Sequence, residues 1–243
     1  MIYLLTLVLK LATNHTRNRC VQLKQNMKKT IILILSITIF SCNNNNDTEE
    51  IINTFNEFNK ANIEMNGEKL YELSDSESHK YYENLLTKIL ELDSIAVSKL
   101  SITDKINLLS ARSVIKDAEL KKISPKDLMI KMYTKVNTMD TVKINAIKKM
   151  EIANIRIEDR NATSDFASNG RILSPKVNLK FSKEDGKWKY NVVSMADFTE
   201  KQLKSICEQN GFSHMDFIKL IFADPNVQDK KIKGLNDIWN PIK

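Results

Sequence analysis

The stretch VNLKFSKEDGKWKYNV, residues 177–192, contains the clearest structural signal in the chain. Apolar and polar residues alternate on both sides of a turn at 183–186 that contains a glycine, which is the pattern of two half-buried strands in a β-hairpin. Alternate side chains of a strand point to the same face, so the apolar ones would share the inner face of a sheet. These inner residues are Val177, Leu179, Phe181, Trp188, Tyr190 and Val192.

Alternation with a period of two residues also precedes this hairpin. Ile155 and Ile157 alternate with polar neighbours, and a second short strand is expected over 163–167, followed by a turn at Asn169-Gly170. We therefore predict a curved antiparallel sheet of about four strands within 141–195. Asp165 is expected at a turn or sheet edge, because aspartate is depleted from strand interiors.

Helical periodicity flanks the predicted sheet on both sides. Apolar residues at helical spacing predict helices over 48–137, including 77–92 and 103–115, and C-terminal helices over 199–223. Together these patterns predict a single α+β domain over 48–243, with N-terminal helices packed on the sheet. Helix starts are expected at Asp47, Ser124, Thr199 and Ser213, with a glycine stop at Gly211.

N-terminal helices followed by strands that end in LKFSKEDGKWK, residues 179–189, resemble the nuclear transport factor 2-like superfamily. The resemblance covers about 48–64 and 141–195. It implies a sheet that wraps around the N-terminal helices as a cone. The helices at 94–137 and the helices after the sheet depart from the family pattern, as a helical insertion and a C-terminal addition.

The segment MKKTIILILSITIFSC, residues 27–42, resembles a bacterial lipoprotein signal peptide. Two lysines precede an apolar run at 31–40 that is too short to span a bilayer. The resemblance implies that 27–41 is a signal peptide and that Cys42 receives the lipid, including palmitate, as a membrane anchor. It places the protein in the cell envelope, at the outer membrane, on the periplasmic face or the cell surface. The following residues, 42–47, are rich in asparagine and predict a flexible tether.

Residues 1–26 precede this signal peptide. Because a signal peptide acts from the N-terminus, we interpret 1–26 as an upstream extension that arises from a mis-assigned start, with Met27 as the true start. A genuine N-terminal extension is the alternative.

The net charge of +7 arises mostly before the predicted lipidation site. Six of the 37 basic residues and none of the 30 acidic residues precede Cys42, which leaves a net charge of +1 for the remainder. A nucleic-acid partner is therefore not expected.

Motifs for catalysis are sparse in this sequence. It contains no glycine-rich phosphate loop, no His-Glu-x-x-His, no Cys-x-x-Cys and no Gly-x-Ser-x-Gly, so no catalytic residue, metal or cofactor is assigned. His79, His214 and Asp165 are the titratable groups considered, and each also has an ordinary structural explanation. Cys207 is expected to be a buried free thiol. Four lysines would share a hairpin face that is either solvated or binds anions: Lys176, Lys180, Lys187 and Lys189.

The leading hypothesis is a non-catalytic accessory domain that binds a small apolar ligand or an envelope protein. Its ligand pocket would be lined by Trp188, Tyr190, Phe181 and Leu179. Two alternatives remain open: a cone-fold enzyme of hydrolase or isomerase type with an unrecognised acid/base pair, and a structural or assembly protein without a pocket.

Overall fold

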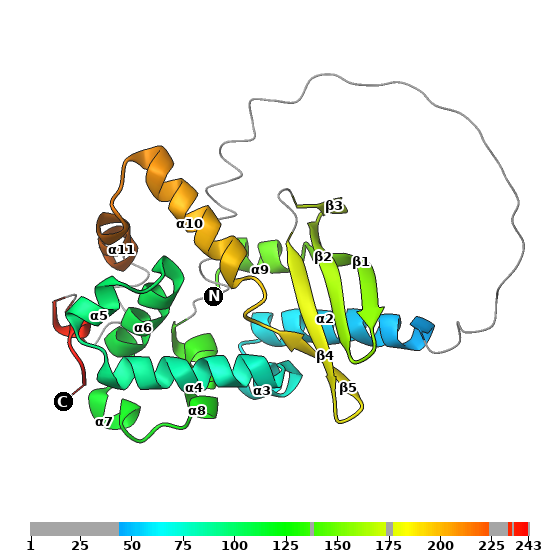
Figure 1. The fold of residues 1–243 in the computed structure, drawn as a ribbon, viewed down its shortest axis with the longest axis horizontal. Helices are drawn as coiled ribbons and strands as arrows, with labels where there is room; N and C mark the ends of the chain where they lie inside the picture. The colour runs from blue at the N-terminus through cyan, green and yellow to red at the C-terminus, as the bar shows by residue number, and fades with distance from the viewer. Residues whose placement is uncertain (1–43, 137–138, 174–176, 224–232, 235, 243) are drawn as a thin grey trace, which may run out of the picture.

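The computed structural model describes residues 44–136, 139–173, 177–223, 233–234 and 236–242. Helix α2 lies against one face of an antiparallel sheet, and most of the remaining helices form a bundle beside that layer (Figure 1). The predicted α+β class, with helices packed on a curved sheet, is confirmed. The predicted signal peptide, Cys42 and Asn43 lie outside the described residues.

The sheet has the order β1-β2-β4-β5, with short β3 paired to β2. The predicted hairpin is confirmed: Phe181 lies opposite Tyr190, and Lys183 lies opposite Trp188. Its two turn residues, Asp185 and Gly186, both have positive φ, 50° and 76°, as a type I′ turn requires. All six predicted inner residues are buried. The strands are β1 (Met150–Glu158), β2 (Asn161–Ser168), β3 (Arg171–Ile172), β4 (Asn178–Glu184) and β5 (Lys187–Asn191).

The sheet begins at Met150, so the prediction of a start at 141 is wrong. Residues Thr141–Ile147 form helix α9 instead, because the Asp140 carboxylate accepts a hydrogen bond from the Lys143 amide (2.8 Å) and caps a helix there. Strand β1 also contains an irregularity that the sequence did not reveal. The register shifts between Ala153 and Arg156, and Asn154 has a φ of 51°, which marks a β-bulge.

Helix α2 (Asn44–Ile63) begins three residues before the predicted start at Asp47. Residues 44–47 are therefore helical, and the prediction of a tether over 42–47 is wrong for that part. Asp47 lies within the first turn of the helix rather than at its N-cap. Its carboxylate accepts hydrogen bonds from Lys183 Nζ (2.5 Å) and Trp188 Nε1 (3.0 Å), which attach the helix start to the β4–β5 hairpin.

One part of the core lies between α2 and the inner face of the sheet, and the core continues among the helices of the bundle. Phe55 and Phe58 contact the Tyr190 ring edge to face, with centroids 5.8 and 4.9 Å apart. Each buried aromatic or aliphatic side chain of this kind contributes about 1.5–3 kcal/mol to the folded state. The contact explains why the N-terminal helix and the last strand are neighbours.

The helices beyond α2 are mostly short. The helices predicted at 77–92 and 103–115 are confirmed as α4 and α6. Ser124 caps α8 as predicted, since its hydroxyl accepts from the Asp127 amide (3.0 Å). The described elements after α2 and outside the sheet are α3 (Gly67–Leu73), α4 (Ser76–Glu91), α5 (Ser94–Ser98), α6 (Ile102–Val114), α7 (Asp117–Leu120), α8 (Pro125–Lys131), π-helix η2 (Met132–Val136), α9, α10 (Ala196–Asn210), α11 (His214–Ala223) and η3 (Asp237–Trp239).

Helix α10 begins at Ala196, so the predicted start at Thr199 is wrong. The neighbouring Glu200 carboxylate reaches another helix: it accepts from the amides of Ile102 (3.2 Å) and Thr103 (3.0 Å) at the start of α6. Glu200 thus supplies a cap to a helix 98 residues earlier in the chain. The predicted stop at Gly211, with a φ of 67°, and the cap at Ser213 are confirmed.

A buried arginine joins the bundle to the C-terminal segment. The Arg112 side chain on α6 is fully buried and donates to the carbonyls of Ile89 (2.8 Å), Leu92 (2.7 Å) and Ile238 (3.1 Å). The carbonyls of Ile89 and Leu92 lie at the C-terminal end of α4, where the last carbonyls of a helix have no partner within the helix. Burial lowers the pKa of Arg112 to about 10, so the guanidinium remains charged at neutral pH.

Replacing Gly67 with alanine is expected to destabilise the protein by about 1–3 kcal/mol. A Cβ atom there would lie 2.7 Å from Ile130 Cγ2 and 3.0 Å from Ile130 Cα, so α3 and α8 would have to separate. Urea unfolding measures the change. Glu72→Ala on the same helix is the control, with an expected effect within about 0.5 kcal/mol. Alanine favours a helix more than glycine does, so without a steric clash the substitution would stabilise the protein. A more stable Gly67→Ala would therefore contradict the close approach of Ile130.

Candidate functional site

The four residues predicted to line a ligand pocket lie in the packed core. Leu179, Phe181, Trp188 and Tyr190 are each no more than 5% exposed. Tyr190 is surrounded by the rings of Phe55, Phe58 and Phe181, and burial raises its pKa. These side chains fill the space that a cone would leave open to a ligand.

A small cavity remains between α2, the sheet, η2 and the start of α10. Its volume is about 20 Å³, on the scale of a single water molecule, whereas ligand pockets usually measure about 300–1,000 Å³. Of the four predicted residues, Tyr190 lines it. The Thr199 hydroxyl also lines it and is buried without a hydrogen-bond partner among the described residues. An organic ligand would have to enlarge this cavity.

A much larger hollow, which we call the hairpin groove, lies between α2, α3 and the β4–β5 hairpin. Its volume is about 360 Å³ and it is open to solvent. It runs along β5, the edge strand of the sheet, beside α2 and α3. Its lining residues are Glu50, Asn53, Thr54, Glu57, Lys69, Glu72, Leu73, Gly186, Lys187, Trp188 and Lys189.

Polar contacts hold the three walls of the hairpin groove in place. The Thr54 hydroxyl on α2 donates to the Trp188 carbonyl (3.2 Å), and Lys69 on α3 pairs with Glu57 on α2 (3.1 Å). Lys189 on β5 donates to the Glu72 carbonyl at the end of α3. The walls are thus fixed relative to one another before any ligand binds.

Charges of both signs face the hairpin groove. Lys69, Lys187 and Lys189 lie among the carboxylates of Glu50, Glu57 and Glu72. The exposed Lys187 ammonium makes no ion pair among the described residues, so it remains available for an anionic group. This hollow could not be predicted from the sequence, because its walls come from three separated segments.

The structure does not bring together the titratable groups considered from the sequence. His79 on α4 stacks on Tyr71, with ring centroids 3.9 Å apart, and its Nε2 lies 3.0 Å from the Tyr71 carbonyl. His214 is exposed at the start of α11, and Asp165 lies on β2. These three groups belong to separate elements and form no acid/base pair with one another.

The prediction that Asp165 is a turn or edge residue is wrong. It lies on β2, between β1 and β4, and is fully buried. Arg156 (3.1 Å) and Asn154 (2.8 Å), both on β1, donate to its carboxylate. The bulge at Asn154 aims that amide at Asp165, so a local irregularity of β1 satisfies a carboxylate in the middle of the sheet.

Sequence reasoning also missed a polar joint between α4 and the sheet. The Asp75 carboxylate is 3% exposed and accepts from the Ser78 amide (2.8 Å), the Ser78 hydroxyl (2.5 Å) and Asn191 Nδ2 (2.9 Å). The Ser78 hydroxyl lies 2.9 Å from the Val192 amide, from which it accepts. Burial raises the pKa of Asp75. The spacing Asp75-x-x-Ser78 is a capping pattern that could have revealed the helix start, although not the strand partner.

Two further predictions concern single side-chain types. Cys207 is buried as predicted, and burial raises the pKa of its thiol. Of the four hairpin lysines, Lys180 and Lys187 are exposed, Lys189 contacts α3, and Lys176 lies outside the described residues. The three described lysines lie on the outer face of the hairpin as predicted, where the register places them opposite Asn191, Glu184 and Ser182.

Comparison with known proteins places this chain in no established group. No family model, no curated protein and no solved structure matches it. The resemblances to lipoprotein signal peptides and to the nuclear transport factor 2-like superfamily therefore stay predictions.

The described residues also bear on metal binding and on membrane crossing. These residues include no cluster of His, Cys, Asp or Glu that could hold a metal ion. Within the same ranges, no helix combines the length and the apolar character that crossing a bilayer requires.

Proposed function

We propose that this protein is a non-catalytic binding domain of the bacterial cell envelope, anchored by a lipid on Cys42, and that the hairpin groove is its ligand site. The observation behind this proposal is the contrast in volume between the two hollows. The hairpin groove, at about 360 Å³, has the size of a ligand pocket, whereas the cavity inside the core measures about 20 Å³.

The chemistry of the hairpin groove favours a polar ligand that carries both charge signs, such as a peptide segment of an envelope protein. Lys187 offers an unpaired cation, and the exposed Glu72 carboxylate offers an anion on the opposite wall. Preformed walls reduce the entropy lost on binding. Rim charges of this kind contribute mainly to specificity and association rate, so a micromolar rather than nanomolar affinity is expected.

The envelope location rests on the sequence of 27–42 alone. That segment matches a lipoprotein signal peptide in its lysines, its apolar run and its cysteine. Asn43 after the cysteine is compatible with sorting to the outer membrane. The near-neutral charge after Cys42 also fits a partner other than nucleic acid.

Native mass spectrometry of the lipidated protein, extracted from membranes in mild detergent, tests this proposal. We expect the wild type to retain, or to bind when it is added, a peptide that carries both charge signs. The double variant Lys187→Glu/Glu72→Lys should bind this peptide with a Kd at least tenfold weaker. Lys219→Glu on α11 is the matched charge control, and its binding should be unchanged. The double variant exchanges two exposed charges, so it should fold normally.

The same experiment separates the alternative ligand sites. Loss of a bound apolar molecule in Thr199→Val, with no effect of the groove variant, would favour the ligand predicted inside the core and contradict the hairpin groove. Failure of the wild type to retain or bind any peptide of a mixed-charge library would also contradict the proposal. Turnover of a bound peptide would favour the enzyme alternative.

A further inference from the structure

The connection between the predicted lipid site and the folded domain is very short. One residue, Asn43, separates Cys42 from the first residue of α2. An extended chain spans at most about 3.3–3.6 Å per residue, so the two steps from Cys42 to Asn44 reach about 7 Å. A flexible tether of the kind predicted over 42–47 would have reached much further.

The first turn of α2 is also attached to the sheet. Asp47 accepts from Lys183 Nζ and Trp188 Nε1, so the helix start cannot rotate away from the β4–β5 hairpin without breaking both contacts. These two donors, with Lys183 first, lower the pKa of Asp47, which keeps the carboxylate ionised at neutral pH.

The β1–β2 turn belongs to the same end of the molecule. The Lys183 amide donates to the Arg160 carbonyl (2.7 Å), and Arg160 Nε donates to the Lys183 carbonyl (3.2 Å). Lys183 thus joins the helix start to the β1–β2 turn, and the β4–β5 turn follows two residues later. We call this group of segments the anchor end. It comprises residues 44–49, 158–160 and 185–187.

We infer that the anchor end faces the surface of the bilayer and that the short connection holds the whole domain in one orientation on it. The inference rests on the lipidation of Cys42 in the proposed function. The polar layer on each side of a bilayer is about 5–7 Å thick, similar to the reach of the connection. Figure 1 shows the start of α2 at one end of the long axis of the molecule and α11 toward the other end, so in this orientation α11 would lie away from the membrane.

The charges of the anchor end indicate which lipid surface it fits. Its exposed acids outnumber its exposed bases: Glu49, Glu158, Asp159 and Asp185 against Arg160 and Lys187. Such a surface gains nothing from anionic lipids. A zwitterionic headgroup layer is the matching partner, and the covalent lipid supplies the attachment.

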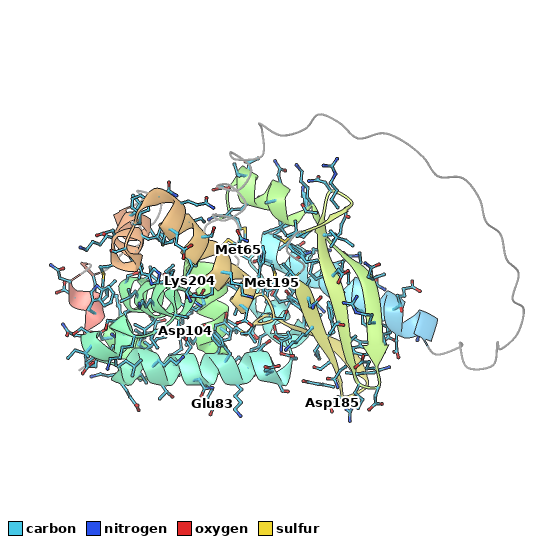
Figure 2. The ribbon with its side chains drawn as sticks, turned by 45° about the horizontal axis from the view of Figure 1, so that its top comes forward. Met65, Glu83, Asp104, Asp185, Met195 and Lys204 are labelled. Atoms are coloured by element: carbon cyan, nitrogen blue, oxygen red, sulfur yellow. The ribbon has the colours of Figure 1, made fainter. Side chains whose placement is uncertain are left out.

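This orientation has a consequence for the hairpin groove. Figure 2 shows Asp185 at the tip of the β4–β5 hairpin. Gly186 and Lys187, which follow it in the chain, line the hairpin groove. The hairpin groove would thus open close to the headgroups. The protein would therefore bind its ligand at the membrane surface rather than deep in the periplasm or far outside the cell.

Two single-cysteine variants of the lipidated protein test the orientation. Glu158→Cys lies at the anchor end and Lys219→Cys on α11, and both positions are exposed. Each is labelled with a fluorophore in phosphatidylcholine vesicles that contain a headgroup quencher. We expect at least threefold stronger quenching at 158 than at 219. The buried Cys207 should not take the label.

Insertion of a 12-residue Gly-Ser linker after Asn43 is the matched control. It leaves the lipid and the domain unchanged but adds a mean reach of about 17–21 Å. The two labels should then be quenched almost equally. Equal quenching without the linker, in protein whose lipid mass is verified, would overturn the inference. Absence of the lipid mass on Cys42 would instead overturn the anchoring on which it rests.

Discussion

Replacing Arg112 with methionine is expected to lower the free energy of unfolding by about 4 kcal/mol, since removal of one partner from a buried charged network costs about 3–5 kcal/mol. The fully buried guanidinium donates to Ile89, Leu92 and Ile238 carbonyls, and methionine would leave all three without that donor. For a domain of this size, the melting temperature should fall by about 8–16 °C. Thermal and urea unfolding measure the change.

Two variants control for charge and for volume at this site. Arg112→Lys keeps the charge but cannot supply the same fork of donors, so it should recover only part of the loss. Arg171→Met removes an exposed arginine and should change the stability by less than about 0.5 kcal/mol. A loss below about 1 kcal/mol in Arg112→Met would show that the α4 end and the C-terminal segment do not depend on the guanidinium.

The second large effect is expected at Asp75. Asp75→Ala removes the cap of α4 and leaves the Ser78 and Asn191 donors without the carboxylate, which should cost about 3 kcal/mol. Asp93→Ala is the matched control. Asp93 caps α5 through the Ala96 amide (2.8 Å) at an exposed site, so its loss should cost only about 1 kcal/mol. Equal losses of stability in the two variants would mean that the hydrogen bonds between Asp75 and β5 do not contribute to the free energy of unfolding.

The stability difference between wild type and Asp75→Ala should also depend on pH. Burial raises the pKa of Asp75 above its ordinary value of 3.8, so between 3.8 and the raised value the folded state binds more protons than the unfolded state. The contribution of this carboxyl to stability therefore grows as pH falls through that window. Urea titrations at pH 7 and pH 4.5 should show a larger advantage of wild type at the lower pH, and the reverse trend would contradict the shift.

Features of this fold with local causes could be predicted from the sequence. The β4–β5 hairpin follows from alternation around Asp185-Gly186, which supply the positive φ that the turn needs. The cap at Ser124 and the stop at Gly211 depend on residues within one helical turn. Burial of Trp188 and Tyr190 also follows from the alternation, because the period sets the face.

Features that depend on distant partners could not be predicted. Asp47 and the segment 199–202 both match capping patterns. However, Asp47 pairs with Trp188, 141 residues away, and Glu200 caps a helix 98 residues away. Asp165 has low strand propensity, but Arg156 and Asn154 satisfy it from the next strand. The hairpin groove was missed for the same reason, since α2, α3 and β5 meet only in the folded chain.

The pairing of α2 with β5 also sets a time order for the growing chain. A ribosome adds about 5–20 residues per second, so roughly 7–28 s pass between the synthesis of Asp47 and that of Trp188, 141 positions later. Throughout that interval the apolar face of α2, with Phe55 and Phe58, lacks the strand that covers it. The packing of α2 is therefore completed only after β5 has been synthesised. A chaperone that binds the apolar face of α2 would protect the chain most before that point.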